Sequence, residues 1–114
     1  MERLKRRADF LAAATGSKVS AAGFVLQARP RDQAGAARVG FTVTKRTGNA
    51  VERNRIRRRL REVVRLSGGA QMQAGHDYVL IGRREALRLP FDKMSDEFAQ
   101  ALKRAHKTGG KDKK

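Results

Sequence analysis

The chain has 114 residues, with 27 Lys and Arg against 11 Asp and Glu, a formal net charge of +16 and a pI near 11.6. This length allows one domain with a modest core, and no apolar run approaches the roughly 20 residues that a membrane span needs. The sequence contains no cysteine, which excludes disulfide frameworks, thiolate metal sites and cysteine nucleophiles. Positive charge in this excess repels itself in the free protein, and a bound polyanion relieves the repulsion. Nucleic acid is therefore the first candidate partner, and an anionic membrane surface is the second.

The two ends of the sequence bear on localisation and on the extent of the domain. The N-terminal segment is basic, but its small apolar run at 11–14 is far too short for a signal peptide. An Arg-rich organelle transit peptide is the alternative, which Glu2 and Asp9 disfavour, so we expect a cytoplasmic protein. The polar segment 108–114 predicts a basic, disordered tail after a single domain over 1–107.

The first predicted element is a helix over 4–14. Leu4, Ala8 and Leu11 fall on one stripe at helical spacing, which predicts that they face the core. Phe10 lies roughly 120° away from that stripe. This position favours an exposed ring, and the alternative is a core residue at the helix edge.

Three strands are predicted from the pattern of apolar residues. They cover 24–29, 38–44 and 77–82, with a possible short strand at 19–20 and a loop at 30–36. The apolar positions of the first two strands are Phe24, Leu26, Ala28, Val39, Phe41 and Val43. The third strand has a continuous apolar run, which is typical of a strand buried on both faces.

Two longer helices are predicted at 50–66 and 91–105. Asn49 and Glu52 have the spacing of a capping box at the start of the first. Its apolar stripe consists of Ile56, Leu60, Val63 and Val64, widened by Leu66. The second helix follows Pro90 and keeps helical spacing at Phe91, Met94, Phe98, Ala101, Leu102 and Ala105.

The helix over 50–66 also carries a dense basic face. Residues 45–65 contain nine Lys and Arg against two acids, and all seven cations within 50–65 are arginine. Arginine binds phosphate in a bidentate way and stacks on bases better than lysine does. Like charges four residues apart destabilise a helix, as at Arg57/Arg61 and Arg61/Arg65. A face that served only solubility would alternate its signs, so nucleic-acid contact is favoured over a solvated face.

The run GNAVERNRIRRRLRE at 48–62 resembles the signature of the bacterial ribonuclease P protein subunit. That family has Arg-Asn-Arg after a Gly-Asn-Ala-Val turn, followed by a basic helix. The segments VGFTVTKRTGNAV at 39–51, LKRRADFLAAATG at 4–16, GFVLQ at 23–27 and DYVLIGRREA at 77–86 resemble the family's other elements. The ordered set covers roughly 4–105 and is far more specific than an arginine-rich helix alone.

The resemblance implies a fold and a role. The implied fold is α+β, a single domain with a mixed central sheet, α-β-β-β-α-β-α order and a left-handed β-α-β crossover, similar to domain 2 of ribosomal protein S5. The implied role is that of the protein subunit of a tRNA-processing endonuclease, ribonuclease P, whose catalytic RNA removes the 5′ leader of precursor tRNA with Mg²⁺. A cytoplasmic ribonucleoprotein with one protein monomer per RNA, and no membrane partner, is expected.

The resemblance also implies two sets of site residues. Those for catalytic-RNA binding are Lys45, Arg46, Arg53, Asn54, Arg55, Arg57, Arg58, Arg61 and Arg65. Those for leader binding are Phe10, Phe24, Arg83 and Arg84. Phe24 is also a natural core residue, and Arg83 and Arg84 could form an ordinary charged turn. Ala14 and Gln27 stand where the family often has aromatic residues, so we expect leader binding to depend more on charge.

The sequence predicts no catalytic residue and no metal ligand of protein origin. His76 and His106 are expected to be isolated surface residues, and the carboxylates are scattered along the chain. RNA phosphates are therefore the better ligands for the magnesium ions. The chief alternative is a small basic ribosomal protein, or another binder of structured RNA with no part in cleavage. A DNA-binding module and a membrane-surface helix are weaker alternatives, because the chain lacks a helix-turn-helix pair and a broad aromatic face.

Overall fold

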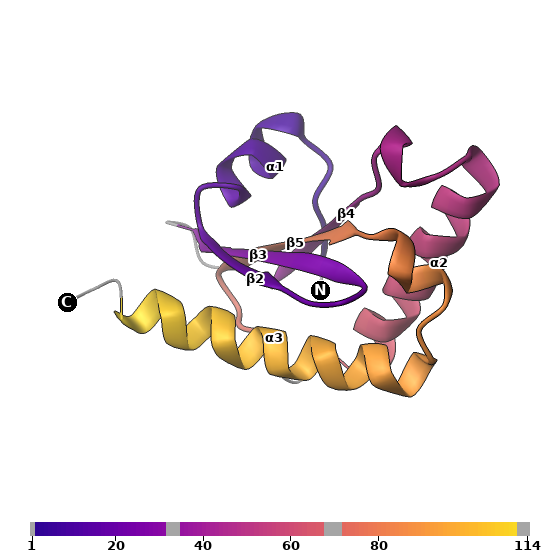
Figure 1. Ribbon diagram of the computed structural model, residues 1–114. Coiled ribbons are helices and arrows are strands. Elements are labelled where there is room, and N and C mark those ends of the chain that lie inside the picture. The colour runs from indigo at the N-terminus through magenta and orange to yellow at the C-terminus, as the bar shows by residue number, and fades with distance from the viewer. Residues whose placement is uncertain (1, 32–34, 68–71, 112–114) are drawn as a thin grey trace.

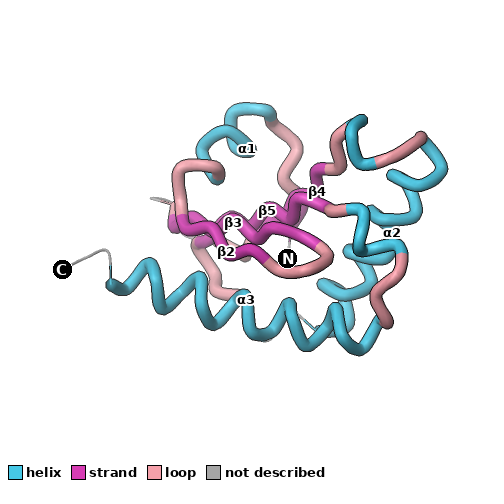
Figure 2. The backbone as a smooth tube through the Cα atoms, in the orientation of Figure 1, coloured by secondary structure: helices cyan, strands magenta, loops and turns pink. Residues whose placement is uncertain are grey.

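The computed structural model describes residues 2–31, 35–67 and 72–111, with side chains as far as His106. The described chain forms three layers, with α1 on one face of a five-stranded mixed sheet and α2 and α3 on the other (Figure 1). The elements are β1 (Glu2–Arg3), α1 (Arg7–Ala13), β2 (Ser17–Ser20), β3 (Phe24–Pro30), β4 (Arg38–Thr42), the 3-10 turn η1 (Lys45–Thr47), α2 (Ala50–Ser67), β5 (His76–Gly82), the 3-10 turn η2 (Arg84–Leu87) and α3 (Phe91–Lys111). Figure 2 shows the helices flanking the strands on both faces. The predicted α+β class is confirmed.

The strand order is β1-β4-β5-β3-β2. β3 is antiparallel to both β2 and β5, whereas β4 is parallel to both β1 and β5. In Figure 1 the chain runs from left to right along β4, returns through α2 on the α3 side of the sheet, and runs left to right again in β5 on the near side of β4. This is the left-handed crossover that the resemblance implied, although about 98% of such connections are right-handed.

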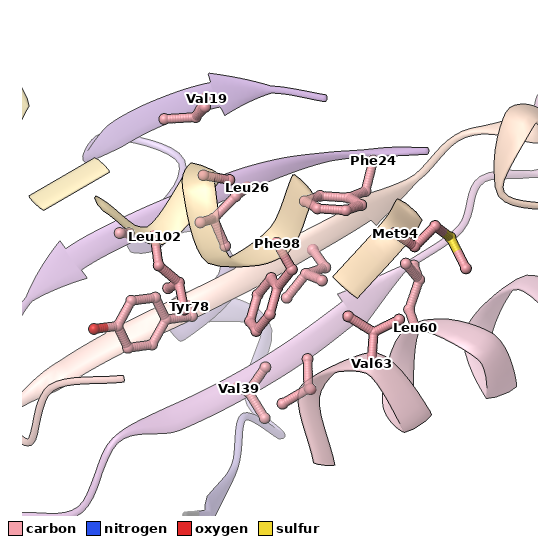
Figure 3. Close-up of a cluster of buried hydrophobic side chains, with 14 of the residues drawn as sticks. Val19, Phe24, Leu26, Val39, Leu60, Val63, Tyr78, Met94, Phe98 and Leu102 are labelled. Carbon is pink, nitrogen blue, oxygen red and sulfur yellow. The ribbon is translucent and has the colours of Figure 1, made fainter. Parts of the chain in front are cut away.

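The main core lies between the sheet and the two long helices (Figure 3). Alternate strand residues and the apolar helix stripes meet there, and the largest fully buried side chains include Tyr78, Phe24, Phe98, Leu26, Ile56, Leu60, Leu80 and Met94. The Phe24 ring has no exposed surface and packs edge-on against Phe98, with centroids 6.1 Å apart. The expectation that Phe24 contacts the leader is therefore wrong. Its position in the alternation of β3 directs it toward α3, which leaves no ring face for a base.

The helix α1 is shorter than predicted and turns a different face to the sheet. Leu11 is 60% exposed and Ala8 is also exposed, whereas Ala13 is fully buried and Phe10 is half-buried beside it. Leu4 is buried but lies in the extended segment before the helix. The predicted stripe was therefore wrong, because it counted Leu4 as helical and three apolar residues in so short a helix do not define a face.

Three further features differ from the predictions: an extra strand, the end of α3 and the exposure of one residue of α2. The charged pair Glu2–Arg3 forms β1, which has no apolar pattern to reveal it. The helix α3 continues to Lys111, into the segment predicted as a disordered tail, and 112–114 lie outside the described residues. Leu66 is 59% exposed, because it sits about 100° from the centre of the buried stripe of α2.

Candidate nucleic-acid interface

The start of α2 is fixed by a reciprocal capping box. The Glu52 backbone N–H donates to Asn49 Oδ1 at 2.9 Å, and the Asn49 N–H donates to Glu52 Oε1 at 3.0 Å. Arg84 donates to both Glu52 carboxylate oxygens, at 2.8 and 3.2 Å. These hydrogen bonds, from Arg84 first and from Asn49 second, lower the pKa of Glu52. A Cβ at Gly48 would lie 2.5 Å from Glu52 Oε1, so a larger residue there would push the Glu52 carboxylate out of its place in the cap.

The crossover gathers cations at one end of the sheet. Because β4 and β5 are parallel, the segments that follow their carboxyl ends lie together. Lys45 and Arg46 follow β4, Arg83 and Arg84 follow β5, and all four are exposed. Arg84 also donates to the Thr47 carbonyl at 3.0 Å, which ties η2 to η1. Arg83 and Arg84, which were predicted to bind the leader, therefore lie beside Lys45 and Arg46, which were predicted to bind the catalytic RNA.

The arginines of α2 divide into an anchored group and an outward group. In the anchored group Arg53 donates to the Gly48 carbonyl at 2.8 Å, Arg57 to the Val43 carbonyl at 3.4 Å, and Arg59 to the Leu89 carbonyl. These three side chains are half-buried and hold neighbouring turns against the helix. The outward group is exposed and consists of Arg55, Arg58, Arg61 and Arg65.

The outward group is the stronger candidate for phosphate contact. Arg65 forms a bidentate pair with Glu62 at 2.9 and 3.0 Å, and the Arg61 guanidinium lies over the Phe41 ring, 6.0 Å from its centroid. Arg55 and Arg58 make no hydrogen bond or ion pair with any residue of the described chain. These two arginines can therefore form charged hydrogen bonds to phosphate without first breaking a hydrogen bond or ion pair to another described residue.

The sheet face beneath α1 is only partly covered. The strand register places Gln27, Val79 and Gly40 in one row, and this row lies under the helix. Gln27 is 6% exposed, so its side chain offers little surface to a ligand. A Cβ at Gly40 would lie 2.5 Å from two ring atoms of Phe10, so the ring rests directly on the glycine.

The next row toward the basic end of the sheet is open. It contains Ser20, Val25, Ile81 and Thr42, of which Ser20 is exposed and the other three are half-buried. The open row runs across four strands between α1 and the cations that follow β4 and β5. An extended polyanion with unpaired bases could lie on it, because backbone charge and apolar base faces would both find partners.

A buried ion network closes the opposite end of the same sheet face. Asp77 is 1% exposed and accepts hydrogen bonds from Arg31 at 2.8 Å and from Arg38 at 2.8 Å on each oxygen. Burial raises the pKa of Asp77, but the hydrogen bonds from Arg38 and Arg31 outweigh it and lower the pKa overall. Asp9 of α1 lies 3.5 Å from Arg38, so the network joins the helix to the sheet.

The two histidines are not isolated, contrary to the expectation. The ring centroids of His76 and His106 lie 5.2 Å apart, and His106 Nε2 is 3.0 Å from the Tyr78 hydroxyl, which accepts from the Gln73 N–H at 2.8 Å. Burial, and then the neighbouring His76, lowers the pKa of His106. The contact joins β5 to α3 across 28 residues of sequence, so no local pattern reveals it.

Neither a metal centre nor a membrane helix emerges from the described residues. No group of three or more His, Asp or Glu side chains in 2–31, 35–67 and 72–106 could hold a metal ion. Three of the carboxylates, Glu52, Glu62 and Asp77, are held by arginine side chains. No helix in the described part of the chain is long and apolar enough to cross a membrane.

Comparison with known proteins decides the family. The Ribonuclease P family matches residues 1–106. The chain belongs to the ribonuclease P protein family. A ribonuclease P protein component from Paramagnetospirillum magneticum is 50% identical over 109 residues, covering 91% of this chain and 82% of its relative. The corresponding protein from Bartonella quintana is 45% identical over 107 residues, covering 89% and 80%.

Solved structures agree with this family. The ribonuclease P protein from Thermotoga maritima superposes with a TM-score of 0.75 at 30% identity, covering 91% of this chain and 97% of that one. The protein from Staphylococcus aureus gives a TM-score of 0.76 at 28% identity, covering 92% and 95%. The family resemblance noted in the sequence is confirmed, and with it the accessory role in the tRNA-processing endoribonuclease.

Proposed function

We propose that the chain binds the catalytic RNA of ribonuclease P through α2 and the 5′ leader of precursor tRNA through the sheet face beside α1. In this role it assists the Mg²⁺-dependent cleavage that gives the mature tRNA 5′ end. The observation that carries the proposal is the capped helix α2, from which Arg55 and Arg58 project, exposed and with no hydrogen bond or ion pair to the described residues.

The catalytic-RNA surface consists of the outward arginines of α2 together with Lys45, Arg46 and Asn54. Arg55 and Arg58 are its centre, because each is exposed and unpaired within the described chain. The anchored arginines, Arg53 and Arg57, keep the turn and strand β4 in place and so support the surface. Removing either would change local structure as well as charge.

The leader surface consists of the open row of the sheet with Phe10 at one side and Arg83 at the other. Phe10 retains exposed ring surface, which can stack on a base. Arg84 contributes less than the sequence suggested, because Glu52 already holds its guanidinium. Because Phe10 is the one described ring beside the open row and several cations lie near it, the leader is bound on this face mainly through its phosphates.

The chemistry of cleavage is assigned to the RNA. The described carboxylates do not suit a magnesium site, because Glu52 and Glu62 are paired with arginine and no group of three described His, Asp or Glu side chains could hold a metal ion. Magnesium ions are therefore held by RNA phosphates, and the protein contributes binding and positioning. A cytoplasmic complex with one protein per RNA follows from this role. The alternative is a binder of another structured RNA, such as ribosomal RNA, with no part in cleavage.

Reconstitution with the host's catalytic RNA tests the proposal. The measurements are assembly affinity and the ratio of affinities for precursor and mature tRNA. Arg58→Gln should weaken assembly, and Phe10→Ala should lower the precursor-to-mature ratio by about 5-fold or more, because one stacked base contributes about 1–3 kcal/mol. Arg104→Gln removes the same charge from an exposed site on α3 and is the control.

Three results would contradict the assignment. If the wild-type protein fails to stimulate precursor cleavage, the function is wrong. If Arg58→Gln lowers the precursor-to-mature ratio while Phe10→Ala weakens assembly, the two surfaces are reversed. If Arg104→Gln weakens assembly as strongly as Arg58→Gln, binding depends only on total charge.

A further inference from the structure

The exposed edge of β4 forms a hollow between the two proposed surfaces, bordered by Phe10 of one and Arg61 of the other. The strand β1 pairs with β4 only at Arg38 and Val39, so the edge of β4 is open beyond that point. A hollow of about 190 Å³ lies there, lined by Arg3, Leu4, Lys5, Phe10, Val39, Gly40, Phe41, Arg57 and Arg61. A second hollow of about 200 Å³ continues it along α2 and shares Arg3, Val39, Phe41 and Arg61.

The backbone at this edge presents one donor and one acceptor that no described residue pairs. The Glu2 N–H donates to the Ala37 carbonyl and the Leu4 N–H donates to the Val39 carbonyl, both at 2.8 Å. Odd-numbered residues of β4 therefore direct their polar groups toward this edge, since the direction alternates along a strand. The next odd residue is Phe41, whose N–H and C=O face the hollow without a strand partner.

The side chains around this backbone suit an unpaired nucleotide. Arg61 lies over the half-buried Phe41 ring at 6.0 Å, which presents its planar guanidinium beside the hollow. Phe10 forms a wall on the α1 side. Arg3, Lys5 and Arg57 supply positive charge for the adjoining phosphates.

We propose that the hollow at the β4 edge binds one unpaired nucleotide of the precursor-tRNA leader. The rings of Phe10 and Phe41 and the guanidinium of Arg61 supply planar surfaces that stack on the base. The N–H and C=O of Phe41 pair with adjacent acceptor and donor atoms on the base edge. Arg3, Lys5 and Arg57 bind the flanking phosphates. The leader is the favoured source because Phe10 borders the hollow as well as the sheet face. In a duplex the base edge is already paired, so the hollow selects single-stranded RNA. This proposal rests on the proposed function.

Two variants test the hollow while keeping the fold. Phe41→Leu retains an apolar side chain and removes the ring, and Arg61→Lys retains the charge and removes the plane. Each should lower the precursor-to-mature affinity ratio of the reconstituted holoenzyme by about 5- to 150-fold, the range expected for one lost stack. Assembly with the catalytic RNA should change less than 2-fold in Phe41→Leu, because Phe41 lies outside the proposed catalytic-RNA surface. Arg61 belongs to that surface, so Arg61→Lys is judged by its precursor-to-mature ratio in the assembled holoenzyme. Arg104→Lys is the control for an arginine-to-lysine exchange outside the hollow, and thermal unfolding checks that each variant folds.

A backbone readout comes from the ¹⁵N-labelled wild-type protein titrated with a seven-nucleotide single-stranded RNA of leader sequence. The Phe41 amide resonance should shift and its hydrogen exchange should slow, whereas a fully paired duplex of the same sequence should leave it unchanged. Unchanged precursor-to-mature ratios in both variants, with normal cleavage by the wild type, would overturn the hollow and leave the proposed function standing. Weakened assembly of Phe41→Leu instead of a lowered ratio would overturn the leader as the source, because the nucleotide would then come from the catalytic RNA. An amide shift produced by an extended peptide but not by the RNA would overturn nucleic acid as the occupant.

Discussion

The replacement Asp77→Asn should destabilise the protein strongly without changing the size of any side chain. Asp77 is 1% exposed and accepts three hydrogen bonds from Arg31 and Arg38. Asparagine keeps one acceptor oxygen, but its amide N–H₂ must point at a guanidinium donor in either orientation. The substitution thus removes a charge and creates opposed donors at a buried site.

The size of the loss follows from how far the partners are buried. Removing one member of a buried ion pair costs about 3–5 kcal/mol. Arg31 and Arg38 keep 12% and 26% of their side-chain surface, so water recovers part of that energy. We expect a loss of about 2–3 kcal/mol in the free energy of unfolding, or roughly 8–12 °C in melting temperature for a chain of this size.

Urea unfolding at pH 7 measures the loss, with Asp9→Asn as the matched control. Asp9 touches the same Arg38 at 3.5 Å but is far more exposed, so its replacement should cost below about 1 kcal/mol. The pKa of Asp77 is lowered in the folded state, so its contribution is complete above the unfolded pKa of about 3.9 and disappears as pH falls through the folded value. The difference between wild type and Asp77→Asn should therefore shrink below about pH 4. An Asp77→Asn protein within about 0.5 kcal/mol of wild type at pH 7 would refute the reasoning.

Three other predictions concern different parts of the molecule. The affinity for the catalytic RNA should fall with salt, with a slope of about −4 to −7 in a plot of log affinity against log salt concentration, if six to eight phosphates are neutralised. A slope shallower than about −2 would exclude α2 as the docking surface. Asn49→Ala should lower the free energy of unfolding by about 0.5–2 kcal/mol through loss of the helix cap. Asn49→Asp, which keeps the acceptor, should stay near wild type, and equal losses in the two variants would argue against the cap. In an NMR titration the pKa of His106 should lie below its usual value of about 6.5, because burial and then His76 disfavour the charged ring, and His76→Asn should raise it; a pKa of His106 at or above 6.5 would contradict the packing.

The parts of the fold that sequence reasoning predicted are those where a local pattern is long or chemically specific. The capping box at Asn49 and Glu52 formed as expected, because both partners lie within one helical turn. The apolar stripe of α2 spans several turns, and its four central residues are buried as predicted. The left-handed crossover between β4 and β5 followed from the resemblance, since generic rules favour the other handedness.

The features that sequence reasoning missed share a different cause, because each is determined by residues that are distant in the sequence. Phe24 could face either side of β3, and only the position of α3 decides that it is core. The Asp77 network joins three strands or their flanking loops to α1, so a carboxylate inside a strand had no local sign of its partners. The hollow at Phe41 exists because β1 ends after two residues, and nothing in a charged dipeptide indicates where pairing stops.

The contact between Phe10 and Gly40 links two positions that lie 30 residues apart in sequence. Any side chain at residue 40 would displace the ring, since even a Cβ would approach it to 2.5 Å. Residue 10 therefore carries an aromatic ring in this place only while residue 40 is glycine. Among relatives the two positions should covary, with a larger residue at 40 accompanied by a smaller one at 10. Lineages that lost the glycine would then depend on other rings, or on charge alone, to select their RNA.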